Sequence, residues 1–195
     1  MSEFRKLRAY LERQASFTEE TFAHLENLYL PRALRAGEFF QRAGDAATHG
    51  AFVATGCLRS YVIDPDGKEH ILQFAPENWW IGDQAGLITP GTISQFFIDA
   101  IEDSNLLVFD RSAHEWMMAN IPGAAAAYRA GLERKAAATD QRIVNALSTT
   151  AEERYEAFVK KYPTIVQRVP QFMLASYLGI TPETLSRVRR HRAGH

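Results

Sequence analysis

Short turn motifs built from glycine, proline and aspartate recur throughout residues 29–110. These recurring turns constrain the fold more than any other feature of the sequence. The segments between them are rich in β-branched and aromatic side chains and cover 38–41, 51–54, 57–63, 70–74, 96–101 and 106–109. Many short strands separated by turns are typical of an antiparallel sandwich or barrel. Asp64-Pro65-Asp66-Gly67 predicts a hairpin between residues 58–63 and 68–74, because proline fixes φ and glycine accepts a positive φ.

Helices are predicted on both sides of this region. Residues 3–13 and 18–29 precede it, and Thr18 is a good N-cap for the second helix. After it, Asn120 as a cap and Pro122 in the first turn indicate a helix of about 25 residues reaching residue 148. Its apolar or small residues recur at spacings of three and four, close to a heptad: Ile121, Ala125, Tyr128, Leu132, Ala136, Thr139, Ile143 and Ala146. The small alanines favour pairing with a second copy; a helix bridging two domains or lying on the sandwich is the alternative.

The last third of the chain predicts further helices. Thr149 or Thr150 caps a helix that ends at Lys161. Val169–Arg190 then predicts two helices joined by a tight turn at Gly179, the second with Thr181 as cap and Pro182 at its first position. The polar residues expected on the outer face of that second helix are Thr181, Glu183, Thr184, Ser186, Arg187 and Arg190. Short polar groups with arginine suit phosphates and base edges, although an ordinary helical hairpin would have the same pattern.

Charge is distributed unevenly along the chain. Residues 1–110 carry 9 Lys/Arg against 16 Asp/Glu, whereas residues 111–195 carry 13 against 7, although the whole chain has a net charge of −1. A basic C-terminal part indicates an anionic partner, or merely a solvated surface.

Several classes of protein are disfavoured. The single cysteine, Cys57, cannot form an intramolecular disulfide or supply the ligands of an iron–sulfur cluster or a structural zinc. No apolar run approaches a membrane span and no signal peptide is evident, so we expect a cytoplasmic protein without a membrane partner. A cupin metalloenzyme is disfavoured because His49 and His70 stand 21 residues apart rather than in the H-x-H spacing. Because the motifs of a P-loop and a nucleophile elbow are also missing, we expect no enzyme.

A strand-rich first part, a long helix, the AEERY segment and the terminal VPQFMLASYLGITPETLSRVRR together resemble the Crp/Fnr family of bacterial transcription regulators. The resemblance implies an α+β protein with three parts. These are a cyclic-nucleotide-binding-like antiparallel β-barrel (double-stranded β-helix) at 1–118, a dimerisation helix at 119–148 and a winged helix-turn-helix at 149–195. Any wing would come from Ile165–Val169.

The resemblance also implies function. Glu183, Ser186 and Arg187 match the E-x-x-S-R pattern of the Fnr-like branch and would read bases, with half-sites of the TTGAT kind. Thr181 and Thr184 match phosphate contacts. The implied partners are double-stranded DNA, a second copy of the chain and RNA polymerase. The alternative is a ligand-sensing or protein-interaction module with vestigial DNA binding.

This sequence departs from the family's pattern most clearly in the phosphate-binding cassette. Gly82-Asp83 and Ser94-Gln95 stand where the family has Gly-Glu and Arg-Ser, and no Lys or Arg lies between Glu69 and Asp110. A buried phosphate without a cation would pay its desolvation cost, so we expect no cyclic AMP binding of the family kind. An unknown effector could instead lie among Phe74, Trp80, Gly82, Asp83, Ser94 and Gln95, although such aromatic residues are more often core. Haem stays open, with His24, His49, His70 and His114 as candidate ligands, and no other cofactor is expected.

Overall fold

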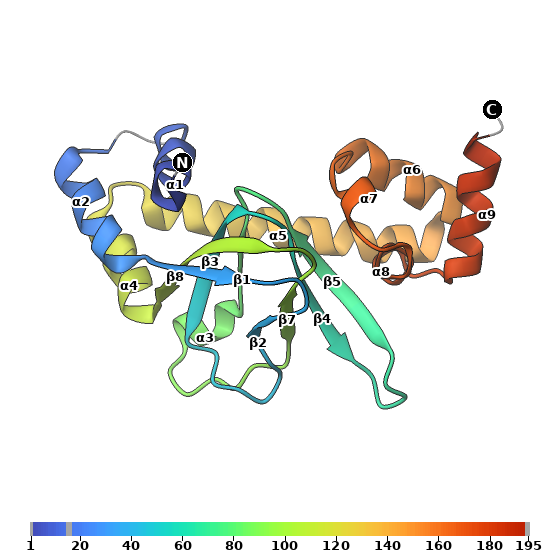
Figure 1. The fold of residues 1–195 in the computed structure, drawn as a ribbon, viewed down its shortest axis with the longest axis horizontal. Helices are drawn as coiled ribbons and strands as arrows, with labels where there is room; N and C mark the ends of the chain where they lie inside the picture. The colour runs from blue at the N-terminus through green and yellow to red at the C-terminus, as the bar shows by residue number, and fades with distance from the viewer. Residues whose placement is uncertain (1, 15–16, 194–195) are drawn as a thin grey trace. The chain divides into compact units, whose positions relative to one another are not determined.

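The computed structural model describes residues 2–14 and 17–193 (Figure 1). The strands are β1 (Leu30–Leu34), β2 (Phe39–Gln41), β3 (His49–Thr55), β4 (Leu58–Ile63), β5 (Glu69–Ala75), β6 (Trp80–Gly82), β7 (Phe97–Ala100) and β8 (Ser104–Asp110). The helices are α1 (Glu3–Glu12), α2 (Glu19–Leu28), α3 (Gln84–Ile88), α4 (Arg111–Asn120), α5 (Ala124–Ser148), α6 (Ala151–Lys161), α7 (Ile165–Arg168), α8 (Gln171–Leu178) and α9 (Pro182–Ala193).

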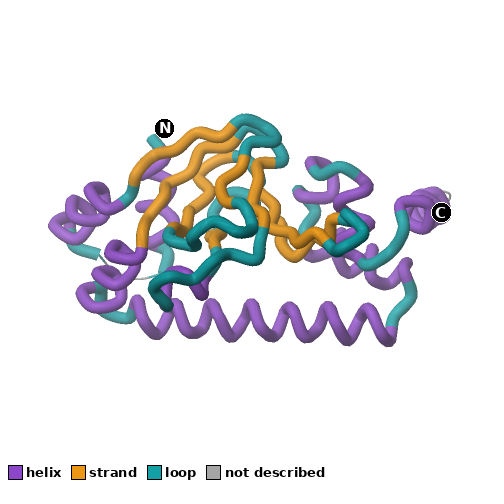
Figure 2. The backbone as a smooth tube through the Cα atoms, turned by 90° about the horizontal axis from the view of Figure 1, so that it is seen from below, coloured by secondary structure: helices purple, strands orange, loops and turns teal. Residues whose placement is uncertain are grey.

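The strands form two antiparallel sheets, ordered β1-β8-β3-β6 and β2-β7-β4-β5, which Figure 2 shows in orange. The expected closed barrel is wrong, because a barrel needs an unbroken ladder around its circumference. Here β1 and β2 are the outer strands of different sheets, β1 pairing with β8 and β2 with β7. The fold is therefore an open jelly-roll-like sandwich.

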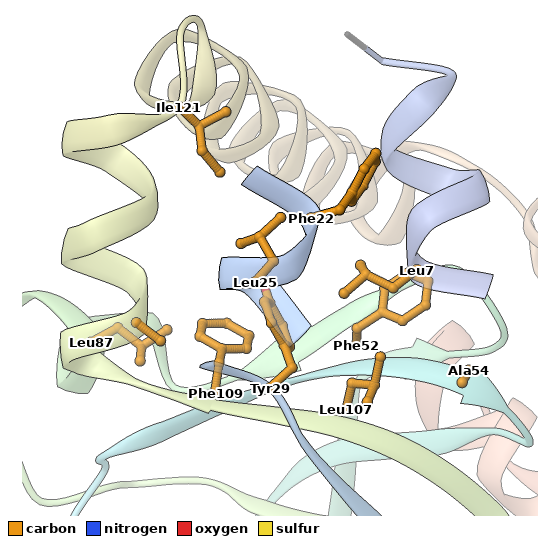
Figure 3. Packing of buried hydrophobic residues seen from close by; sticks show 11 residues of the cluster. Leu7, Phe22, Leu25, Tyr29, Phe52, Ala54, Leu87, Leu107, Phe109 and Ile121 are labelled. Atoms are coloured by element: carbon orange, nitrogen blue, oxygen red, sulfur yellow. The ribbon is translucent and has the colours of Figure 1, made fainter. Parts of the chain in front are cut away.

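Because successive side chains of a strand point to opposite faces of the sheet, the apolar residues form two clusters. In β3, Ala51 and Val53 face a cluster with Leu58 and Ile98 of the second sheet, so this cluster lies between the sheets. Phe52 and Ala54 point the opposite way, into a cluster that includes Leu7 of α1 and Phe22 and Leu25 of α2 (Figure 3). The first sheet is buried on both faces, which explains the nearly continuous apolar run of β3.

Local sequence rules account for several boundaries. Thr18 caps α2 by accepting a hydrogen bond from the Thr21 N–H, as predicted. The β4–β5 hairpin also forms as predicted, with Gly67 at φ 81° and a hydrogen bond from Asp64 N–H to the Lys68 carbonyl.

The long helix has the predicted length of 25 residues but begins later than expected. Asn120 ends α4 instead of capping α5, and the chain turns through Pro122 and Gly123, whose φ is 82°. The C-cap of α4 is Ile121, which is buried in the helix-covered cluster. The predicted heptad starts at Ile121, whereas in the structure Ile121 packs in that core and the long helix begins after it.

The chain divides into two compact units. One runs up to Val62 and continues over Gln73–Ala127; the other comprises Ile63–Leu72 and the residues from Tyr128 onward. In the second unit the expected wing is wrong, because Ile165–Arg168 forms a helical turn and the described part of residues 149–193 contains no strand.

Candidate nucleic-acid interface

The turn between α8 and α9 is built as the sequence predicts. Gly179 takes the left-handed conformation, with φ 67° and ψ 36°, and ends α8. The Ile180 N–H donates to the Ala175 carbonyl at 3.0 Å, which closes the last turn. Two residues later Thr181 caps α9 by accepting a hydrogen bond from the Thr184 N–H.

Buried apolar residues fix the orientation of α9 on its neighbours. Leu185 is 1% exposed, and Leu174 and Ala175 of α8 are fully buried. Tyr155 and Phe158 of α6 are also buried, and α6 contacts both α8 and α9. The inner face of α9 is thus held by packing, so the directions of its outer side chains are set.

The outer face of α9 is polar and exposed. Glu183, Ser186, Arg187 and Arg190 line one shallow hollow together with Pro182. The structure therefore brings together four of the six residues predicted for this surface. Thr181 and Thr184 are not among the residues that line this hollow, although Thr184 contacts Arg187.

Thr184 contacts Arg187, and Thr181 in turn contacts Thr184. The Arg187 Nη2 group donates to the Thr184 hydroxyl at 3.2 Å, and the Thr181 hydroxyl oxygen lies 3.2 Å from the Thr184 hydroxyl oxygen. Sequence reasoning had Thr184 as a phosphate contact and missed its position beside Arg187, which the i, i+3 spacing could have indicated.

Glu183 is kept ionised. Hydrogen bonds from its own backbone N–H and then from the Thr181 hydroxyl lower the pKa of its carboxyl, and the positive charge of Arg187 lowers it further. The hollow thus combines a carboxylate acceptor with guanidinium donors, the groups that can contact base edges and phosphates.

The long helix α5 presents a different surface. None of its residues is buried. Of the predicted seam, Ala125, Thr139 and Ile143 are exposed, whereas Tyr128 and Leu132 are half-buried. Ile121, also predicted for the seam, lies outside α5 and is buried in the helix-covered core.

Two exposed apolar residues of α5, Val144 and Leu147, were not part of the predicted heptad. Ile143 is 54% exposed, and its neighbours Val144 and Leu147 are 51% and 84% exposed. Leu147 follows Ile143 by four residues and so extends the apolar face to the end of the helix.

The residues predicted for an effector pocket have structural roles. Trp80 packs against Tyr10, Phe52 and Phe109 on the helix-covered face of the first sheet, rather than between the sheets. The buried Asp83 carboxylate caps α3 by accepting from the Ala85 N–H at 3.1 Å.

The other residues predicted for the effector pocket do not form a phosphate-binding cassette. The Ser94 hydroxyl is buried and bonded to the backbone of Phe96, both as donor and as acceptor. Gly82 at φ 151° lies against Gly50, Phe74 is buried and Gln95 is exposed.

Two arginines near the sandwich were missed. Arg59 of β4 is buried and forms a two-pronged ion pair with Asp99 of β7, at 2.7 and 2.9 Å. Arg111 folds back onto the end of α3 and donates to the carbonyls of Gly86 and Thr89. The Arg59–Asp99 pair could have been predicted from the sequence, because each residue is a charged residue within an apolar strand.

The four candidate haem ligands lie in separate environments. His24 stacks on Trp116, His49 contacts the Thr48 hydroxyl and His70 pairs with Asp64. His114 is buried, and this burial lowers the pKa of its imidazole. Within residues 2–14 and 17–193, no three His, Cys, Asp or Glu side chains gather as a metal site, and no helix is long and apolar enough to cross a membrane.

Comparison with known proteins agrees with this architecture. Residues 31–120 match the cyclic nucleotide-binding domain family. No curated protein sequence matches the chain significantly.

Solved structures of similar fold cover most of the chain. FixK2 from Bradyrhizobium japonicum superposes with a TM-score of 0.74 at 22% identity, over 85% of this chain and 86% of FixK2. The c-di-GMP-responsive global regulator CLP from Xanthomonas campestris gives 0.71 at 14% identity, over 91% and 92%. A protein from Eubacterium rectale described as a crp/fnr-family transcriptional regulator gives 0.68 at 14% identity, over 90% and 83%. These likenesses establish the fold, including the C-terminal helices.

Proposed function

We propose that this chain is a transcription regulator of the Crp/Fnr type, which binds an inverted-repeat DNA site as a homodimer. The observation that carries the proposal is the outer face of α9. Glu183, Ser186 and Arg187 are exposed there side by side, on a helix held in place by the buried Leu185. The regulator structures of similar fold support the same class.

The chemistry of this face suits the major groove. Arg187 can donate two hydrogen bonds to O6 and N7 of guanine, and the ionised Glu183 can accept one from the N4 amino group of cytosine. Arg190, one turn further on, would contact phosphate. The resemblance of this helix to the Fnr-like branch implies half-sites of the TTGAT kind.

The homodimer would form through α5. None of the 25 residues of α5 is buried, and Ile143, Val144 and Leu147 leave an exposed apolar surface near the end of the helix in the single chain. Leu132 and Ile143 would lie in the seam with Ala125, Tyr128 and Thr139. Two-fold-related α9 helices would then enter successive major grooves, with half-site centres about 10–11 base pairs apart. RNA polymerase would be the further protein partner of such a regulator.

Cyclic AMP is not expected to bind in the manner of the family's phosphate cassette. Ser94 and Gln95 offer no cation, and the Asp83 carboxylate is already engaged at the start of α3. Arg111 reaches that helix, but its guanidinium donates to backbone carbonyls. Calorimetry should therefore detect no binding of cyclic AMP, whereas a micromolar dissociation constant would show that this reasoning is wrong.

The decisive experiment compares two arginines of α9 on a duplex selected from a random pool. Arg187→Ala should weaken binding by about 1–3 kcal/mol and relax the preference at one base pair per half-site. Arg190→Ala should weaken binding to all sequences alike and lower the slope of log K against log salt by about one.

The two variants serve as each other's control, because each removes one arginine from the same face. If Arg187→Ala changes neither affinity nor base preference, α9 does not read DNA as proposed. If the unmodified protein shows no salt-dependent binding to any duplex, the vestigial module is the correct interpretation.

A further inference from the structure

A serine of α8 is bonded to the outer edge of strand β5. β5 is the last strand of the sheet ordered β2-β7-β4-β5, so one edge of its backbone faces away from the sheet. The Ser176 hydroxyl accepts from the Ile71 N–H at 3.0 Å and donates to the Glu69 carbonyl at 2.8 Å. One residue of an added parallel strand would bond to the same two groups, so Ser176 takes the place of a strand partner.

Arg142 of α5 reaches the same stretch of β5. Its Nη1 group donates to the Leu72 carbonyl at 2.8 Å and, at 3.5 Å, to the Ile71 carbonyl. The guanidinium carbon also lies 4.9 Å from the centre of the Tyr177 ring, the residue after Ser176 in α8. Arg142 is half-buried, and a cation over an aromatic ring stabilises more where it is partly desolvated. The side chain of Arg142 therefore joins the long helix to both β5 and α8.

These contacts bear on α9 because α8 packs with α9 and α6. Tyr177 packs edge-on against the buried Phe158 of α6, with ring centroids 5.3 Å apart, and α6 contacts α9 as well. Whatever holds α8 therefore also holds the outer face of α9. Residues 69–72 of β5, the helix α5 from Tyr128 onward and the helices α6 to α9 all belong to the second unit.

The joint between α5 and the helices beyond it is short. Residues 149–150 separate the end of α5 from the start of α6. Arg154 of α6 donates to the Ala146 carbonyl beside this joint at 3.0 Å. Arg142 lies six residues before the end of α5, which is about 9 Å along the helix. Its contacts therefore restrict rotation about the joint with a longer lever arm than those of Arg154.

We propose that Arg142 and Ser176 are positioning residues that set which spacing between half-sites the dimer accepts. The inference rests on the proposed function, in which α5 forms the dimer and α9 reads DNA. The contacts of Arg142 and Ser176 with β5 and α8, here called the β5 latch, hold each α9 at one angle to the dimer helix. Base preference within a half-site comes from Glu183 and Arg187, whereas the separation of the two half-sites depends on the β5 latch.

Binding to duplexes that differ only in the spacing of two selected half-sites tests the proposal. The wild-type protein should bind about tenfold more weakly when the spacing is changed by one base pair, because the change moves and rotates one half-site. Ser176→Ala and Arg142→Met should lose most of this discrimination while they keep the base preference at the position read by Arg187. Both variants should remain dimers in sedimentation velocity.

Matched controls come from the same unit. Ser148→Ala removes a hydroxyl that donates to the Val144 carbonyl of its own helix, and Arg134→Met removes an exposed arginine of α5. Both controls should discriminate between spacings as the wild type does. A variant that is only less stable would lose affinity for every spacing alike, so the ratio between spacings separates positioning from folding.

Hydrogen exchange observes the β5 latch directly. The Ile71 amide, which donates to the Ser176 hydroxyl, should exchange about tenfold faster in Ser176→Ala than in the wild type. Ser176→Thr keeps the hydroxyl and should restore both the slow exchange and the spacing preference. Wild-type discrimination in both Ser176→Ala and Arg142→Met would overturn the role of the β5 latch and leave the proposed function standing. A wild-type protein that binds none of the duplexes would overturn the proposed function and this inference with it.

Discussion

The helix pair α8–α9 and the helix α5 differ in the burial of their apolar residues. In α8–α9 most of the apolar positions, among them Leu174 and Leu185, are buried within the chain, although Phe172 is 54% exposed, and the polar face is left outside. In α5 the apolar positions Ile143 and Leu147 are left outside, and no residue is buried. Most of the stability of a helix in a protein comes from packing of its apolar face, so α8–α9 is complete in one chain and α5 is not.

The largest effect is expected where a charge enters the α5 seam. Leu132→Asp or Ile143→Asp would place an unpaired carboxylate in the interface of both protomers, and burying an unpaired charge costs several kcal/mol. Sedimentation velocity should show a monomer for both variants. Gln141→Asp, on the opposite face of the same helix, should remain a dimer. A dimer that survives both seam substitutions would contradict this comparison.

Truncation inside the helix pair should destabilise a single protomer. Leu185→Ala removes a side chain that is 1% exposed, which costs about 2–5 kcal/mol. Chemical denaturation followed by circular dichroism would measure this loss. Ser186→Ala, the next residue on the exposed side, should lie within about 0.5 kcal/mol of the parent. Equal effects at the two positions would mean that α9 is not held by this core.

A smaller effect is expected from the cap of α6. The Thr150 hydroxyl accepts from the Glu153 N–H while the Glu153 carboxylate accepts from the Thr150 N–H. Thr150→Ala should cost about 0.5–2 kcal/mol in the same denaturation experiment. Thr149→Ala, which removes only a hydroxyl bonded to the Asn145 carbonyl, is the matched control and should cost less.

The same cap predicts a pH dependence. The Thr150 N–H, and then its hydroxyl, lower the pKa of the Glu153 carboxyl. The contribution of Glu153 is therefore complete above the pKa of an unfolded glutamate and is lost as the pH falls through the lowered value. Glu153→Gln should show less acid sensitivity than the parent, and identical pH profiles would remove Glu153 from this role.

The smallest effect concerns the threonine beside Arg187. Thr184→Val removes the hydroxyl that accepts from the Arg187 guanidinium, and one hydrogen bond is worth about 0.5–1.5 kcal/mol. We expect a weaker preference for the selected duplex, with a nearly unchanged salt slope. Thr184→Ser should restore the preference, and failure of this rescue would show that the hydroxyl does not position Arg187.

Much of the architecture follows from local rules written in single residues. Thr18, Gly67, Thr150 and Gly179 each occupy the predicted cap or turn, because hydrogen-bonding side chains and a permitted positive φ act within a few residues. The strands β1 and β6 were not predicted. Both are short, β1 contains Pro31, and each is defined by pairing with a strand far along the chain.

The amino-acid sequence by itself determined the β4–β5 hairpin, the turn between α8 and α9 and the polar face of α9. Only the tertiary structure decided that the sandwich stays open, that Ile121 belongs to the core and that Gln41 turns inward at an open edge. The first group depends on contacts within about one helical turn, where periodicity and propensity act. The second depends on which distant strands pair and in what register, and a shift of one residue in β2 is enough to carry a side chain from one face to the other.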